Sequence, residues 1–364
     1  MAVLDRSDSA PPAASPRDAF HGGDDKALLR AAAELTREFG TADARIYWAD
    51  MLVSAIVGYA ALAGAIGLSS PGLAVASAVV AILALYRAGS FIHELTHIHR
   101  SALPGFRLVW NLLVGIPLMI PSFLYEGVHT QHHAKTRYGT VDDPEYLPLA
   151  LMKPWTLPLF VVAAMLAPIA LMFRFAVLTP LSLMSPRLRT MVVERYSGLQ
   201  INPAYRRKPA EGDLAQMWRW QEGAASLWAI ALLALVISRV IPLRSFAIFL
   251  GVASGTMLLN QVRTLVAHLW ENDGEPMSVT AQYLDSVNVP PPGSLPELWA
   301  PVGLRYHGLH HLLPSVPYHA LGKAHRRLCA ELDAQSPFHA SSHRGLLPLV
   351  KRLAASSWRG GNPA

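Results

Sequence analysis

The stretch FIHELTHIHR, residues 91–100, raises the question on which the interpretation of this chain depends. On a helix, side chains four residues apart lie on one face with their Cβ atoms about 6 Å apart, so His93 and His97 can bind one metal ion together. The same five residues match the H-E-x-x-H pattern of zinc proteases, in which Glu94 would be the hydrolytic base. The pair is therefore either a zinc-hydrolase site or one part of a larger metal site.

The composition is typical of a multi-pass membrane protein. Of the 364 residues, 52% are hydrophobic and 15% are charged, whereas about 25% of the residues of a soluble domain are charged. The net charge of +6 fits loops that face anionic lipid, and the sequence has no basic, aromatic-interleaved module that would indicate nucleic-acid binding. The single cysteine, Cys329, excludes an internal disulfide, a cysteine-based zinc site and a cysteine-ligated iron–sulfur cluster.

Four apolar runs predict an all-α fold with four transmembrane helices in two hairpins. The runs are 47–69, 73–97, 223–241 and 244–267. A helix of about 25 residues is about 37 Å long, which exceeds the hydrocarbon core of about 30 Å. The second run therefore places His97 just beyond the bilayer. His268 follows the end of the fourth run in the same way. The loop between Thr179 and Glu222 has seven Lys/Arg against four acidic residues, which places it and the histidines on the cytoplasmic side.

Two further apolar segments are ambiguous. A single crossing by either would separate the histidines across the bilayer, so we interpret 106–124 as re-entrant or interfacial, and 150–178 as the same or as a proline-broken hairpin. The expected organisation has four parts: a disordered tail (1–23), an amphipathic helix and lead-in (24–46), a membrane domain with a cytoplasmic helical cap (47–330), and a C-terminal interfacial helix and tail (331–364).

Nine histidines fall into four clusters that could share one site. The pattern H-x-x-H-H occurs twice, and on a helical turn it points three imidazoles to one face. A zinc protease would leave at least five of these histidines without a role, whereas nine imidazoles suit two metal ions with four or five ligands each. Imidazole binds iron, zinc, copper and nickel alike, so ligand type does not select the metal. The candidate ligands are His93, His97, His129, His132, His133, His268, His307, His310 and His311.

The order and spacing of these clusters resemble those of the membrane fatty acid desaturase family, which also contains alkane and carotenoid hydroxylases. The closest likeness is LHHLLPSVPYHALGKAHRRL, residues 309–328, in which two histidines precede a Leu-Pro-x-x-Pro-Tyr-His run. The resemblance covers roughly residues 47–330 and implies a non-haem di-iron centre that uses O₂ and two external electrons, with the nine histidines as ligands. Acyl-CoA members have an asparagine one helical turn before the isolated histidine; here that position is Thr264, and Asn260 lies two turns back.

Several polar residues near the clusters could support the site. Glu94, Asp142 and Asp143, with Glu145, could each orient an imidazole through its N–H, although a helix-surface acid and a turn before Pro144 explain them nearly as well. Other nearby side chains are Arg100, Arg263 and Arg305, which could bind a carrier or headgroup or could extend to lipid phosphates.

The sequence therefore predicts a membrane di-iron oxidoreductase that acts on an acyl chain or related lipid. Removal of two hydrogens would give a double bond and insertion of oxygen would give an alcohol; the C-terminal box favours desaturation, with hydroxylation of an alkyl, acyl or carotenoid substrate as the alternative. A separate donor of the ferredoxin, rubredoxin or cytochrome b5 type, with its reductase, would supply electrons. A metal transporter is disfavoured because its ligands would lie near mid-membrane, whereas these lie at the ends of spans.

Overall fold

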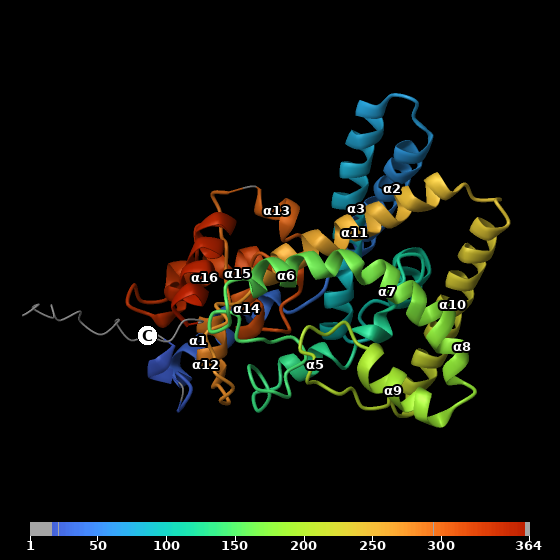
Figure 1. Cartoon of the computed structure of the whole chain (residues 1–364). Coiled ribbons are helices and arrows are strands. Elements are labelled where there is room, and N and C mark those ends of the chain that lie inside the picture. The colour runs from blue at the N-terminus through green and yellow to red at the C-terminus, as the bar shows by residue number, and fades with distance from the viewer. Residues whose placement is uncertain (1–16, 21, 294, 361–364) are drawn as a thin grey trace, which may run out of the picture.

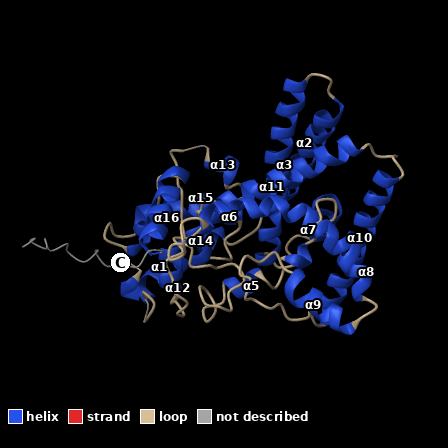
Figure 2. Cartoon of the chain, viewed as in Figure 1, coloured by secondary structure: helices blue, strands red, loops and turns tan. Residues whose placement is uncertain are grey.

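The computed structural model describes residues 17–20, 22–293 and 295–360. This part of the chain consists of helices and loops with no strand (Figure 2), which confirms the all-α prediction. Of the predicted disordered tail, residues 1–16 and 21 lie outside the described residues. Residues Arg17 to Phe20 are described, and Arg17 donates a hydrogen bond to Asp285 in the cap. The ordered part of the protein therefore begins before residue 24, where the expected tail was to end.

Two pairs of long helices, each pair joined by a short turn, form the membrane part. They are α2 (Ala44–Gly67) with α3 (Pro71–His97), and α10 (Gly212–Ile237) with α11 (Leu243–Leu265). The Asp43 side chain caps α2 by accepting from the N–H groups of Arg45 and Ile46, and Pro71 begins α3 at a position where no N–H is needed. Both hairpin turns point away from the short helices that carry the histidines (Figure 1).

The outer faces of these helices are apolar and exposed. Val53, Ile56 and Val75 have 59%, 65% and 65% of their surface exposed, as expected for side chains in contact with lipid tails. The inner faces pack closely, since α2 and α3 meet at Gly58, where an added Cβ would lie 2.6 Å from Leu85 Cδ2. By contrast, α10 and α11 diverge from their shared turn (Figure 1), and α11 packs against α3. The arrangement is that of an integral membrane protein.

The segment 150–178 folds differently from the hairpin considered above. Residues Thr156–Ser182 form one run of helix comprising α6 (Thr156–Ala163), α7 (Ala167–Phe173) and α8 (Thr179–Ser182), so that five helices, not four, are long and apolar enough to cross a membrane. Prolines are tolerated here because Pro168 and Pro180 each stand in the first turn of a segment, where the missing N–H is not required.

The chain on either side of this fifth helix returns to one place. The N–H groups of Ile201 and Asn202, after the helix, both donate to the carbonyl of Pro144, before it. The helix that joins the fifth apolar helix to Ile201, α9 (Pro186–Tyr196), is too polar to cross a bilayer. In Figure 1 the α6–α7 run crosses α3 and lies beside α11, with which it packs. The return of the chain to Pro144 favours four crossings, with this apolar helix not passing through the bilayer; the number of crossings stays a prediction.

The segment 106–124 is compact and short. It forms α4 (Phe106–Trp110), a wide helical turn to Gly115 and a tight turn at Ser122–Leu124. Ten helical residues span about 15 Å, half of the hydrocarbon core, so this segment cannot cross. Trp110 Nε1 donates to the carbonyl of Ala88 and holds the segment against α3.

A cap of short helices covers the histidine ends of the spans. It contains α1 (Lys26–Thr36), α5 (His129–His132), α12 (Val279–Asp285), α13 (Pro296–Trp299), α14 (His307–Leu312), α15 (Tyr318–Glu331) and α16 (Leu346–Gly360). The amphipathic helix α1 buries Leu28 and Ala32 against Leu321, Ala324 and Leu328 of α15. The cap therefore has its own apolar core, which fixes α14 above the membrane helices.

We expect Gly58→Ala to destabilise the α2–α3 hairpin by about 1–3 kcal/mol, because the new methyl group would overlap Leu85. The measurement is the thermal unfolding midpoint of the purified protein in detergent. Gly72→Ala is the matched control, since a Cβ at Gly72 meets nothing within 4 Å. Equal midpoints for the two variants would show that the helices are not in close contact at Gly58.

Candidate metal centre

Four separate segments bring the nine histidines together. His93 and His97 lie on the last turns of α3, the second cluster occupies α5 and the residue after it, His268 follows α11, and the third cluster lies on α14. Their ring nitrogens form two adjacent groups, in each of which the candidate ligand atoms all lie within 4.8 Å of one another. The first group is His93, His97, His129, His133 and His310, and the second is His132, His268, His307 and His311.

The distances between ring nitrogens fit coordination of a metal ion. The Nε2 atoms of His129 and His133 are 3.0 Å apart, and those of His268 and His307 are also 3.0 Å apart. Two nitrogens at about 2.1 Å from one ion and at right angles to each other would be separated by about 3.0 Å. The Nε2 atoms of His93 and His97 are buried without a hydrogen-bond partner, as expected of ligand atoms.

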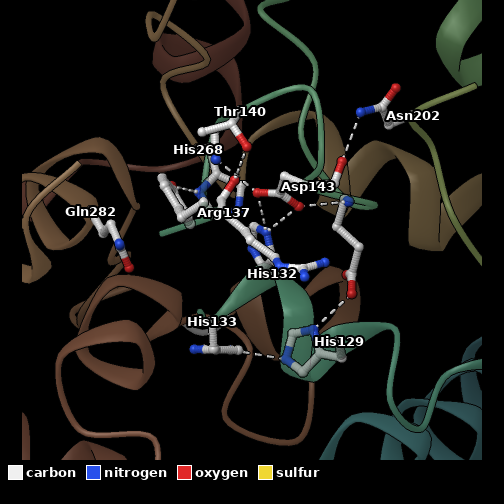
Figure 3. Close-up of polar contacts among 12 residues, drawn as sticks. His129, His132, His133, Arg137, Thr140, Asp143, Asn202, His268 and Gln282 are labelled. Carbon is white, nitrogen blue, oxygen red and sulfur yellow. Dashed lines mark hydrogen bonds and ion pairs between the residues drawn. The ribbon is translucent and has the colours of Figure 1, made fainter. Parts of the chain in front are cut away.

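Carboxyl and hydroxyl groups orient several of these rings from behind (Figure 3). Asp143 lies 2.9 Å from Nδ1 of His132, and Glu145 lies 2.8 Å from Nδ1 of His129. A carboxylate on Nδ1 fixes the proton there and leaves the Nε2 lone pair free for a metal ion. The helix α5 thus supplies these two candidate ligands, and the loop that follows it supplies the groups that orient them.

His268 is oriented through a longer chain of hydrogen bonds. The hydroxyl of Tyr138 donates to Asp285 at 2.9 Å and lies 2.7 Å from Nδ1 of His268, and the Ser286 hydroxyl is 3.2 Å from the same nitrogen. Because the tyrosine hydroxyl gives its proton to Asp285, it accepts from His268. The imidazole therefore presents Nε2 to the second group.

Burial keeps these imidazoles in the neutral form that metal binding requires. Desolvation lowers the pKa of His129, His133 and His310 well below the usual value for histidine. Burial acts in the same direction on His132, but the nearby carboxylates of Asp143 and Glu145 together outweigh it and raise the pKa of His132. Bringing so many unprotonated ring nitrogens together is unfavourable unless a cation lies between them, so the residues present fit bound metal ions.

Glu94 of the H-E-x-x-H segment has structural partners. Its carboxylate accepts from the Tyr47 hydroxyl at 2.5 Å and from the N–H of Tyr318 at 3.2 Å, and it lies 3.5 Å from Nδ1 of His93. It thereby connects α3 to α2 and α15. Since its group has five imidazoles, where catalytic zinc has three protein ligands and an open position, the zinc-protease interpretation is not supported.

The structure separates the other predicted supporting residues. Asp143 is fully buried against His132, whereas its neighbour Asp142 is exposed and has no bond to a ligand histidine. Asn260 and Thr264 line a cavity next to His93. Residues that sequence reasoning missed are Tyr125, which donates to Glu145, and Tyr138; neither stands in a motif that would have indicated it.

A large cavity begins at the metal centre. It has a volume of about 550 Å³, and its wall includes His93 and Tyr125 at the centre, Leu85 on α3 and Leu159 on α6. Most of its lining is apolar. Trp155 and Leu159 are 60% and 55% exposed, so the cavity opens between α6 and α11 toward the lipid-facing surface. We call it the central cavity.

Comparisons with known proteins identify the class to which this fold and site belong. The fatty acid desaturase family profile matches residues 69–342, and the chain belongs to this family, a class of di-iron enzymes. The resemblance inferred from the histidine clusters is thereby confirmed. A ceramide hydroxylase of Caulobacter vibrioides is 49% identical over 329 residues, which cover 90% of this chain and 93% of that protein. No solved structure gives a significant match.

We expect Asp143→Asn to weaken metal binding by about 10- to 100-fold, because the amide cannot hold the His132 proton as the carboxylate does. The measurement is metal content by elemental analysis after dialysis against a chelator. Asp142→Asn removes the same charge at the exposed neighbouring position and should retain its metal. If both variants kept full metal content, Asp143 would have no role in orienting His132.

Proposed function

We propose that this protein is an O₂-dependent di-iron oxidoreductase that hydroxylates a membrane lipid of the ceramide type. The observation that carries the proposal is the pair of adjacent histidine groups, five and four imidazoles, at the inner end of the central cavity. The likeness to a ceramide hydroxylase favours hydroxylation over the desaturation that the third histidine cluster suggested. Desaturation by the same centre is the second candidate, because family membership is compatible with both.

The nine histidines would hold the two iron ions, five around one and four around the other. Bound iron would supply the oxidising chemistry: O₂, two electrons and two protons convert C–H into C–OH and release one water molecule. The protein's own part is to position the lipid and to exclude water. The outcome depends on placement of the reacting carbon, since a correctly held C–H bond is oxidised in preference to its neighbours.

The central cavity is suited to a lipid chain that comes directly from the bilayer. Its apolar wall is formed by α3, α6 and α11 together with loop residues such as Leu147 and Ile201, and the residues at its opening, Trp155 and Leu159, are exposed on the membrane side. Gly89 and Ser90 give α3 a small-residue face where the cavity passes it. An acyl chain could therefore reach the centre without leaving an apolar environment.

Electrons would come from a separate carrier on the cytoplasmic side. A second cavity of about 590 Å³ lies beside α5 and is lined by Gln131, Arg137, Arg206 and Lys208, with Glu126 and Glu211 as its acidic residues. We call it the basic groove. Its position next to the second histidine cluster and its excess of positive charge suit an acidic electron carrier of the ferredoxin, rubredoxin or cytochrome b5 type.

The test of the proposed function is lipid analysis of cells with and without the gene. Cells that express the protein should contain hydroxylated amide-linked lipids, and His132→Ala should abolish them because the second group loses a ligand. His99→Ala is the control, since His99 is exposed and belongs to neither group. A product that persisted in the His132→Ala strain would contradict the assignment, and new double bonds without hydroxyl groups would favour desaturation.

The role of the basic groove is tested by charge reversal. The double variant Arg206→Glu/Lys208→Glu should slow turnover with an acidic protein donor by about tenfold at low salt, with a smaller effect at high salt. Turnover driven by dithionite should stay unchanged, because the metal centre is intact. Arg244→Glu, on the opposite side of the membrane helices, is the control. Equal loss with protein donor and dithionite would show damage to the centre instead of the docking surface.

A further inference from the structure

The polar side chains of the central cavity are concentrated at its inner end. The cavity follows α3 from Leu85 to His93 and α11 from Thr256 to Thr264, each about 12 Å of helix. Asn260, Gln261, Arg263 and Glu145 line the half near the histidines. At the far end of the cavity on α11, the Thr256 hydroxyl bonds to a carbonyl of its own helix and offers no free donor. The Ser90 hydroxyl, one turn before His93, is engaged in the same way. A bound lipid would therefore have its polar group beside the centre.

Arg263 has no carboxylate partner among the described residues, although it is half-buried. Its Nε is buried without a hydrogen-bond partner, and Nη2 is 3.4 Å from Nδ1 of His307. The four buried arginines among the described residues all have polar partners: Arg17, Arg174 and Arg305 pair with Asp285, Glu222 and Glu297, and Arg207 donates to the carbonyls of Ser197 and Glu126. An unpaired guanidinium in an apolar cavity is unfavourable, and an oxygen atom of a ligand would satisfy it.

The charges of the cavity wall favour a neutral polar group. Its lining includes one guanidinium, Arg263, and one carboxyl group, Glu145, whose oxygens are engaged by His129 and Tyr125. A phosphate or free carboxylate at Arg263 would face that carboxyl group in a water-poor space. An amide carbonyl can accept from Arg263, while Asn260 and Gln261 can both donate to and accept from a neighbouring N–H or hydroxyl.

We propose that Arg263 binds the carbonyl oxygen of an amide-linked lipid and thereby directs hydroxylation to a carbon within a few bonds of that amide. The proposal rests on the proposed function and adds the position of attack. A guanidinium that contacts His307, a member of the second histidine group, holds the bound oxygen close to the centre. The remainder of the chain then extends along α3 and α11, away from the reacting atoms.

The test compares Arg263→Gln with Arg244→Gln, which changes an exposed arginine at the other end of the same helix. The iron-loaded enzyme is given an N-acylated sphingoid base, and separately the free fatty acid of the same chain length. Binding of each lipid is measured by fluorescence competition, the hydroxyl position by tandem mass spectrometry, and iron by elemental analysis. Arg263→Lys is included because lysine keeps the charge without the planar fork of donors.

We expect the unmodified enzyme to bind the amide lipid more tightly than the fatty acid and to place one hydroxyl near the amide. Arg263→Gln should bind the amide lipid about 10- to 100-fold more weakly and spread the hydroxyl over several positions, with iron content unchanged. Arg263→Lys should be intermediate, and Arg244→Gln should match the unmodified enzyme.

Four outcomes would overturn the proposal. They are a mid-chain hydroxyl in the unmodified enzyme, tighter binding of the fatty acid, unchanged binding in Arg263→Gln, and loss of iron from that variant, which would make Arg263 a support of His307. Failure of the proposed function looks different: the iron-loaded enzyme would oxidise neither lipid. Weaker binding of the amide lipid to Arg263→Gln would in that case still support the binding site.

Discussion

The structure depends on the convergence of buried imidazoles between the long helices and a cap. No single segment can build this arrangement, because the rings come from the ends of α3 and α11, from the loop at α5 and from α14. Each ring gives up hydration, and a cation among the nitrogens would offset that loss. We infer that metal binding would stabilise the assembled cap.

The groups behind the rings explain why the cap is so heavily bonded. Asp143 accepts from the Gly139 and Glu145 N–H groups as well as lying against His132, so it organises the loop as it orients the ring. Asn202 then donates to the carbonyl of Asp143 and joins this loop to the chain beyond α9. In consequence, segments distant in sequence become rigid at the point where ligand geometry must be accurate.

Patterns of local spacing made much of the fold and site predictable. H-x-x-H-H places three imidazoles on one turn whatever surrounds it, and the position of His268 after an apolar run was enough to place it beside the others. The course of 156–182 was not predictable, because its prolines are compatible with a break or with helix starts, and contacts across the fold decide between these.

The supporting residues show the same division. Asp142 and Asp143 are indistinguishable in sequence, and only the turn before Pro144 determines that one is buried and the other exposed. Tyr138 carries no signal at all, since a tyrosine that orients a ligand across 130 residues belongs to no local pattern. Features set by local geometry were thus available from the sequence, and those set by the assembled cap were not.

Arg17 gives the beginning of the chain an influence on the centre. It binds Asp285, which accepts from Tyr138, which in turn holds His268. A protein that began at α2 would lack Arg17, and the buried Asp285 carboxylate would have lost its positively charged partner. The Tyr138 hydroxyl, which bonds to both Asp285 and His268, would carry that change to the ligand ring. We therefore expect that removal of Arg17 by proteolytic trimming would disturb the position of the His268 ring, although the two residues lie far apart in sequence.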